Sequence, residues 1–407
     1  MKKPFEEYRG LRRENYVLFF GKVVTSLGSM VWPMTTMILS QKLGMDAGTI
    51  ASVLMLVSIV SIPLGLLGGK LADHFSKKKV IVVCDLISVS GYIICAIRKL
   101  DFFSMVLFAA AALLQQLESP SYSALVADIT YPKDRERAYS LNYLGMNLGM
   151  MLAPTIGGLL FKNHLNLAFL INGVSIGSST LLIWFFLKNT ERVSDESSVY
   201  EKAMEQSSTW QVLKNNRLIL LYILITAIAY AVYCQYSYLM PLDMGIVHGE
   251  DGAAIFGTLS SLNCIVVVIF TPLITRYFQK VRECGKMIIG QALVVLGYIL
   301  FRGNLGTVPL YYVSILLFTW GEIFHTLSTD PYLTRRIPEN FRGRIMSVSA
   351  AVSALLYALS EPLVGNTYDT LGSRAAWRTV ILAGVAGVIL TGILDVLDHR
   401  RYPDLYH

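Results

Sequence analysis

The chain has 407 residues, of which 54% are hydrophobic and only 15% are charged, and its formal net charge is +7. Soluble chains carry about 25% charged residues, so the apolar excess here must face something other than water. This composition excludes an ordinary soluble protein and favours a membrane protein.

Long uncharged runs along the chain indicate membrane helices. The runs at 53–69 and 218–234 approach the roughly 20 residues that a helix needs to cross the hydrocarbon core of a bilayer. Lipid offers no hydrogen-bond partners, so these runs must be helical. We therefore expect an all-α integral membrane protein with twelve transmembrane helices. In chain order, the expected spans are 15–40, 48–70, 79–98, 102–128, 138–161, 166–187, 217–240, 252–275, 285–302, 307–330, 344–365 and 376–397.

The distribution of charge predicts the orientation. The first span is too long for the core of a signal peptide and lacks a suitable small-residue cleavage site, so we expect it to be retained. With the amino terminus inside, most of the 35 Lys and Arg residues fall in cytoplasmic segments, and Lys22 falls within a span. This pattern predicts a multi-pass protein of the cell (plasma) membrane with both termini cytoplasmic. Because orientation explains the net positive charge, we expect no nucleic-acid partner.

The sequence contains no motif typical of an enzyme. Its five cysteines have no metal-ligand spacing and are expected to be packing residues without disulfides. No Walker-type phosphate loop is present, and no nucleophile with a base is visible. We predict no metal, no cofactor and no enzymatic activity.

A polar, serine-rich segment at 188–216 separates six expected spans from six. We predict an N-terminal six-helix bundle at 1–187, a cytoplasmic linker at 188–216 and a C-terminal six-helix bundle at 217–407. Residues 137–158 and 344–365 share Arg and Ser three apart, then Pro and Gly three apart, which indicates an internal repeat. Two related, pseudo-symmetric halves are how a secondary transporter builds a central site at mid-membrane.

The segment at 69–78 reads GKLADHFSKK, and through it the chain resembles the major facilitator superfamily. That family carries G-x-L-A-D-R-x-G-R-K between its second and third spans. Gly69 is expected to permit close helix approach. The resemblance implies that the loop latches the two halves in the outward-open state, with Asp73, Lys77 and Asp128 in a charge network at the cytoplasmic face. We also expect a monomer.

The fifth span contains GMMLAPTIGG at 149–158. It is similar to the G-x-x-x-G-P-x-x-G-G motif that the superfamily shows chiefly in exporters exchanging substrate for protons, with Ala153 in place of one glycine. Small residues and Pro154 allow tight packing and a bend, and a generic packing face is the alternative interpretation. The expected gating residues are Gly69, Asp73, Lys77, Lys78, Asp128, Arg137, Gly149, Pro154, Gly157 and Gly158.

Carboxylates at membrane depth are costly and are therefore functional candidates. Glu118 and Glu322 occupy equivalent spans of the two halves, and we expect them to face one another across the pseudo-twofold axis. The arginine that many family members carry in the fourth span is replaced by Phe108 or a nearby alanine. The segment around Glu322 resembles proton-driven drug exporters of the LmrP type, which implies a carboxylate that binds substrate and proton. Asn142 stands where such exporters have an aspartate.

The remaining polar candidates carry two interpretations each. His325 could relay a proton or simply pack, Glu361 could line the cavity or face the external gate, Asp85 could snorkel or pair with a lysine, and Lys22 could neutralise a carboxylate. Aromatic faces near a carboxylate suit lipophilic cations or serve ordinary packing. The expected proton-coupling and substrate residues are Glu322, Glu118, Glu361, His325, Asn142, Tyr230, Tyr233 and Trp320.

Taken together, these patterns predict a transporter that works by alternating access, with small molecules, protons and the lipid bilayer as its partners. Proton-coupled efflux of small amphipathic or cationic compounds is the favoured function. A proton-coupled uptake symporter, a lipid-linked substrate flippase and a non-transporting membrane sensor stay open as alternatives.

Overall fold

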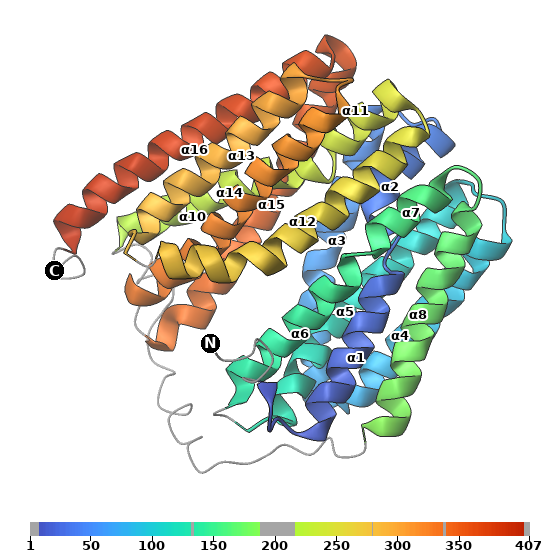
Figure 1. Ribbon diagram of the computed structural model, residues 1–407. Coiled ribbons are helices and arrows are strands. Elements are labelled where there is room, and N and C mark those ends of the chain that lie inside the picture. Colours follow the sequence, from blue (N-terminus) through green and yellow to red (C-terminus); the bar gives the residue numbers. More distant parts are fainter. Residues whose placement is uncertain (1–7, 132–133, 188–215, 279, 337–338, 403–407) are drawn as a thin grey trace. The chain divides into compact units, whose positions relative to one another are not determined.

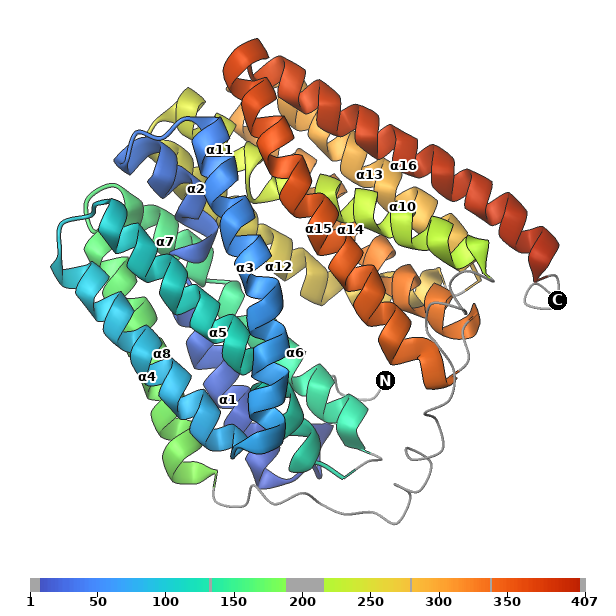
Figure 2. The same ribbon diagram turned by 180° about the vertical axis from the view of Figure 1, so that it is seen from behind.

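The computed structural model describes residues 8–131, 134–187, 216–278, 280–336 and 339–402. Within these ranges the chain forms helices joined by turns and short loops, without a strand, as Figure 1 and the reverse view in Figure 2 show. The expected all-helical class is confirmed. The predicted linker lies outside the described residues except for Asn216.

Eleven stretches of the described chain are long and apolar enough to cross a membrane, so the multi-pass membrane protein expected from hydropathy is confirmed. They correspond to eleven of the twelve expected spans. The stretches are Arg13–Lys42, Ala47–Ala72, Lys77–Ile97, Phe102–Val126, Arg137–Phe161, Leu165–Phe186, Arg217–His248, Asp251–Thr275, Glu283–Gly303, Ile345–Leu371 and Ser373–Arg401.

The remaining expected span, 307–330, is a helix as well. It forms α14, Val308–Arg336, which has 29 residues and is long enough to cross a bilayer. It is not among the eleven apolar stretches, because polar side chains such as Glu322 and His325 interrupt its apolar run. The count of twelve membrane-spanning helices therefore stays a prediction.

The chain divides into two compact units, each described here by itself. The first comprises residues 1–44, 57–200 and 248–264, and the second comprises residues 45–56, 201–247 and 265–407. Boundaries between the units fall within α3 (Ala47–His74) and α12 (Asp251–Tyr277) and at the last residue of α11 (Leu239–His248). The first unit also contains α1 (Arg13–Gly28), α2 (Thr35–Met37), α4 (Lys77–Ile97), α5 (Phe102–Asp128), α6 (Arg135–Met150), α7 (Ala153–Phe161) and α8 (Leu165–Phe186). The second also contains α10 (Arg217–Tyr233), α11 (Leu239–His248), α13 (Glu283–Gly303), α14, α15 (Glu339–Leu371) and α16 (Ser373–Arg401). The two bundles and the domain boundaries predicted from the sequence stay predictions.

Three of the expected spans are interrupted. In the first, α1 ends at Gly28 and a short 3₁₀ turn, Trp32–Met34, precedes α2. Between α6 and α7 the chain turns, and Pro154 lies in the first turn of α7, where a missing N–H costs no helical hydrogen bond. Between α10 and α11 the chain forms a short 3₁₀ turn, Cys234–Tyr236. The hydroxyl of Tyr298 donates to the carbonyl oxygens of Val232 and Tyr233 at 3.0 Å each. These bonds tie α13 to the carboxyl end of α10 beside Tyr233.

Apolar side chains fill the interior of each unit and also cover its outside. A buried cluster around Leu18, Ile81 and Leu125 lies in the first unit, and one around Tyr222 and Met287 lies in the second. Large apolar side chains are also exposed on many helices, including Ile87, Leu159, Leu220 and Ile389. Exposed apolar surface on this scale suits a lipid environment.

Candidate substrate and coupling site

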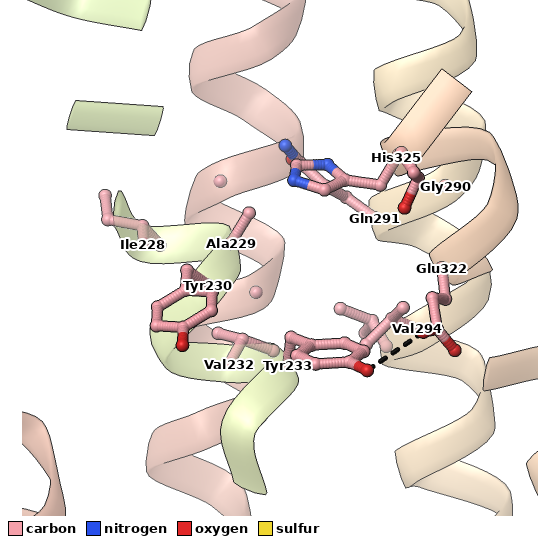
Figure 3. A pocket seen from close by; sticks show the side chains of 14 residues that line it. Ile228, Ala229, Tyr230, Val232, Tyr233, Gly290, Gln291, Val294, Glu322 and His325 are labelled. Atoms are coloured by element: carbon pink, nitrogen blue, oxygen red, sulfur yellow. Dashed lines mark hydrogen bonds between the residues drawn. The ribbon is translucent and has the colours of Figure 1, made fainter. Parts of the chain in front are cut away.

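A cavity of about 250 Å³ lies in the second unit, between α10, α13, α14 and α16. Figure 3 shows the side chains that line it. Most of the lining is apolar or aromatic. Glu322 of α14 contributes a carboxyl group and His325 of α14 contributes an imidazole. A mostly apolar pocket with a few polar groups is the usual form of a small-molecule site.

Close contact between α13 and α14 positions Glu322. A Cβ atom on Gly321 would meet the carbonyl oxygen of Gly290, and a Cβ on Gly290 would meet the carbonyl oxygen of Gly321. The two glycines therefore let the backbones approach closely. Glu322, which follows Gly321, is thereby placed in the wall of the cavity.

Tyr233 provides a hydrogen-bond donor for this carboxyl group. Its hydroxyl lies 2.9 Å from Oε1 of Glu322, and Figure 3 marks this bond. The Tyr233 ring stacks on Phe318, with centroids 5.3 Å apart and an angle of 19° between the planes. A hydrogen bond to an ionised carboxylate is stronger than one between neutral groups, so the strength of this bond depends on whether Glu322 carries a proton.

Two other polar side chains in the cavity each have an atom without a hydrogen-bond partner. Nδ1 of His325 and Nε2 of Gln291 are buried and have no hydrogen-bond partner among the described residues. Oε1 of Gln291 accepts a bond of 3.1 Å from the hydroxyl of Thr391. Buried polar atoms without partners are costly, so both nitrogens suit a polar group of a ligand. Gln291 was not among the site residues predicted from the sequence, although an amide side chain within an apolar span could have indicated it.

Tyr230 lines the cavity as predicted and connects it to a second carboxyl group. Its ring packs edge to face on Tyr357 at 5.8 Å, and the Tyr357 hydroxyl donates to Oε1 of Glu361 at 2.5 Å. Glu361 is fully buried and is not part of the cavity lining. It lies behind the aromatic pair rather than in contact with the pocket space.

Trp320 does not line the cavity. It packs against Phe270 of α12, with ring centroids 5.8 Å apart, in an apolar cluster with Ile323 and Phe324. The expectation that its ring flanks Glu322 at the substrate site is corrected here. Residues two apart on a helix point to different faces, so Glu322 and Trp320 cannot both face the cavity.

The first unit holds the other predicted polar residues. Glu118 lies on α5 beside Asp85 and Lys22, and Asp85 is buried rather than snorkelling. Asn142 on α6 accepts a bond of 3.1 Å from the Tyr122 hydroxyl and donates to the carbonyl oxygen of Ala138. Its amide is thus engaged within the unit. That Glu118 and Glu322 face one another stays a prediction.

Part of the predicted charge network is present in the first unit. Lys77 and Asp128 form an ion pair of 2.8 Å. Lys78 donates to the carbonyl oxygens of Trp184 and Leu187 at 2.8 Å each, which ties the start of α4 to the end of α8. The side chain of Asp73 lies outside the described residues. The role of these residues in gating stays a prediction.

Arg137 binds locally. Its guanidinium pairs with Asp134 at 2.8 Å and also donates to the carbonyl oxygen of Arg9 at 2.8 Å. It therefore joins the start of α6 to the segment before α1.

The close helix approach predicted at Gly69 lies at Gly68 instead. A Cβ on Gly69 would meet no other atom within 4 Å, whereas a Cβ on Gly68 would meet the carbonyl oxygen of Leu117. Adjacent helical residues point about 100° apart, so only one of the two glycines can face α5.

The small residues of the fifth span do make close contacts. A Cβ on Gly149 would meet the carbonyl oxygen of Val23 on α1, and a Cβ on Gly157 would meet that of Met30. A Cβ on Gly158 would meet the carbonyl oxygen of Ala253 on α12. Buried Pro154 starts the short helix that carries the last two glycines. The motif thus brings backbones together, as its composition predicted.

Two buried charged groups in the second unit were not predicted from the sequence. Asp243 on α11 accepts hydrogen bonds from Tyr368, Ser373 and Trp377 at 2.6–2.7 Å. Arg336 at the end of α14 forms a two-point ion pair with Asp398 of α16. Both groups connect helices that are distant in sequence, and no local pattern indicates such partners.

Comparison with known proteins identifies a family and a fold. A family model of the Major Facilitator Superfamily matches residues 18–361. The chain is 23% identical over 417 residues to the Na(+), Li(+), K(+)/H(+) antiporter of Planococcus maritimus, covering 92% of this chain and 94% of that one. It is 24% identical over 394 residues to the multidrug resistance protein MdtH of Yersinia enterocolitica, covering 95% of each. The fold is similar to that of a peptide transporter POT in complex with sulfate, with a TM-score of 0.76, 17% identity and coverage of 95% of this chain and 94% of that one.

Proposed function

This chain belongs to the major facilitator superfamily of transporters, and we propose that it exports small amphipathic or cationic compounds in exchange for protons. The proposal includes twelve membrane-spanning helices in two six-helix bundles, with α14 added to the eleven apolar stretches. It places a monomer in the cell membrane with both termini in the cytoplasm. Two relatives are named a cation/proton antiporter and a multidrug resistance protein, which supports both the exchange and the substrate class.

The observation that carries the proposal is the carboxyl group of Glu322 in a mostly apolar cavity. A charged carboxylate away from water is costly unless it is protonated or has a cationic partner. The Tyr233 hydroxyl supplies one donor. A proton or the positive group of a substrate can each stabilise Glu322 in this cavity, and the two exclude each other.

The surrounding side chains suit an amphipathic cation. A positive group about 4 Å from the carboxylate would gain about 4 kcal/mol at an effective dielectric constant of about 20. The rings of Tyr230 and Tyr233 in the lining could add about 0.5–2 kcal/mol through cation–π contact. Apolar residues such as Ile228, Val294 and Val295 can hold the rest of the molecule without directional bonds, which favours a broad range of substrates.

Competition for one carboxyl group couples the two fluxes. When the site opens to the side with more protons, a proton displaces the cation, which leaves. When the site opens to the cytoplasm, a cation displaces the proton. Through Glu322, one proton then enters for each monovalent cation exported, and the exchange at this site alone moves no net charge.

The test is transport of a permanently charged lipophilic cation, tetraphenylphosphonium, in everted membrane vesicles with an imposed pH gradient. We expect cation movement opposite to the proton gradient with the wild-type chain. Glu322→Gln keeps the shape of the side chain but cannot ionise, so it should abolish this movement and remove the pH dependence of binding. Glu250→Gln, at an exposed carboxylate paired with Lys42, is the matched control and should transport normally.

Two results would contradict the proposal. Cation movement in the same direction as the protons would indicate uptake symport. Wild-type transport and pH dependence in Glu322→Gln would place the proton acceptor elsewhere.

A further inference from the structure

A second group of buried ionisable residues lies in the first unit, where α4 packs against α5 and α8, and α1 packs against α8. Asp85 of α4 is 6% exposed, and Glu118 of α5 lies in contact with it. Lys22 of α1 is attracted to both carboxyl groups. Thr180 of α8 donates its hydroxyl proton to Oδ2 of Asp85 at 2.6 Å.

The contact between the two carboxyl groups requires a proton. A side-chain hydrogen bond links Asp85 and Glu118, but ionised carboxylates contain only acceptors. Oε2 of Glu118 is buried and has no hydrogen-bond partner among the described residues. Two negative charges this close cannot both be ionised without a large cost, so the pair shares one proton.

Thr180 indicates which group carries that proton. Its hydroxyl has a single proton, with the Asp85 carboxylate and the carbonyl oxygen of Ile176 within reach. An ionised carboxylate is the stronger acceptor. Donation by Thr180 therefore stabilises the charge on Asp85 and leaves the shared proton on Glu118.

Lys22 balances the remaining charge. Its ammonium group lies over the ring of Tyr122, 5.4 Å from the centroid, and acts on the carboxyl groups through space. With one proton bound, the group has one positive and one negative charge and is neutral overall, which a membrane interior tolerates best. Loss of the proton leaves a net negative charge. The other ionisable groups near the pair in the described part of the chain are Cys84 and Tyr92 of α4 and Tyr122 of α5.

We propose that Lys22, Asp85 and Glu118 form a second proton-binding site, separate from Glu322, that binds and releases one proton in each transport cycle. The proposal deepens the proposed proton-coupled transport. Release of the proton once in each transport cycle rests on that proposed function. The proton leaves Glu118 for water when the site becomes hydrated and returns from the opposite side. A second proton would make the exchange of a monovalent cation sensitive to membrane voltage, because net positive charge then enters.

The test separates proton binding from transport. Infrared difference spectra of the purified full-length chain across a pH series report protonated carboxyl groups directly, and the Glu322→Gln background removes the contribution of that residue. We expect a protonated-carboxyl signal with a component that is lost on adding Glu118→Gln, while buried Glu361 can supply a component that stays. Adding Lys22→Met instead should preserve the signal to higher pH, since removal of the positive charge makes the proton harder to release. Adding Glu250→Gln, at an exposed carboxylate, should change nothing.

The outcomes are decisive for each proposal separately. An identical protonated-carboxyl signal with and without Glu118 would overturn the second proton site. An unchanged pH dependence in Lys22→Met would overturn it as well. The Lys22→Met variant tests the site even if Glu118→Gln does not fold. Absence of cation transport by the wild-type chain in vesicles, with the infrared result as expected, would overturn the proposed function and leave the proton site standing.

Discussion

Replacement of Tyr233 by Phe tests the chemistry of the Glu322 site with the loss of one oxygen atom. The hydroxyl donates to Oε1 of Glu322 at 2.9 Å, while the ring, which stacks on Phe318, is retained. A hydrogen bond is worth about 1.5–3 kcal/mol to a charged acceptor and about 0.5–1.5 kcal/mol to a neutral one. When a cation displaces the proton, the bond changes from the neutral to the charged kind. Tyr233→Phe should therefore weaken cation binding by about 1–1.5 kcal/mol, or about five- to tenfold.

The assay is equilibrium binding of tetraphenylphosphonium and of an uncharged amphipathic compound of similar size to the purified chain. The loss should be confined to the cation and should be larger at acidic pH, where the proton competes, than at alkaline pH. Tyr222→Phe is the matched control, because this hydroxyl on the same helix donates to the carbonyl oxygen of Thr329 and Tyr222 lies outside the cavity lining. An equal loss for the charged and uncharged compounds would refute the reasoning and reduce Tyr233 to a packing residue.

Two further predictions concern packing and a buried charge. Gly157→Leu should slow transport while the chain still inserts, because a Cβ at this position already meets the carbonyl oxygen of Met30. Turnover in vesicles measures this effect, with Gly69→Ala as the control. Normal turnover in Gly157→Leu would reject the role of the motif. Asp398→Ala should lower stability by about 3–5 kcal/mol, because it leaves the guanidinium of Arg336 buried without its partner. Thermal unfolding in detergent measures this loss, and the double change Arg336→Met with Asp398→Leu should recover much of it. Equal losses in the single and double variants would argue against the ion pair as the cause.

Helices and their membrane environment could be predicted from the sequence because both depend on contiguous residues. A run of apolar side chains in lipid must satisfy its backbone hydrogen bonds internally, so hydropathy alone located the eleven apolar stretches that the structure contains. The same local logic located the break at Pro154 and the tight backbone contacts of Gly149, Gly157 and Gly158. It also identified Glu322 and Glu118 as costly groups within spans.

The partners of those groups were decided only by the tertiary structure. Which side chains meet depends on how far each helix is rotated and shifted against its neighbours, and a few residues of difference move a group to another face. Thus Tyr233, which is 89 residues from Glu322 in sequence, contacts it, while Trp320, only two residues away, packs on Phe270. Asp85, Glu118 and Lys22 lie close together because α1, α4, α5 and α8 bring together residues from four separate spans. The sequence contained each of these side chains, but their pairing is a property of packing between helices and has no signal along the chain.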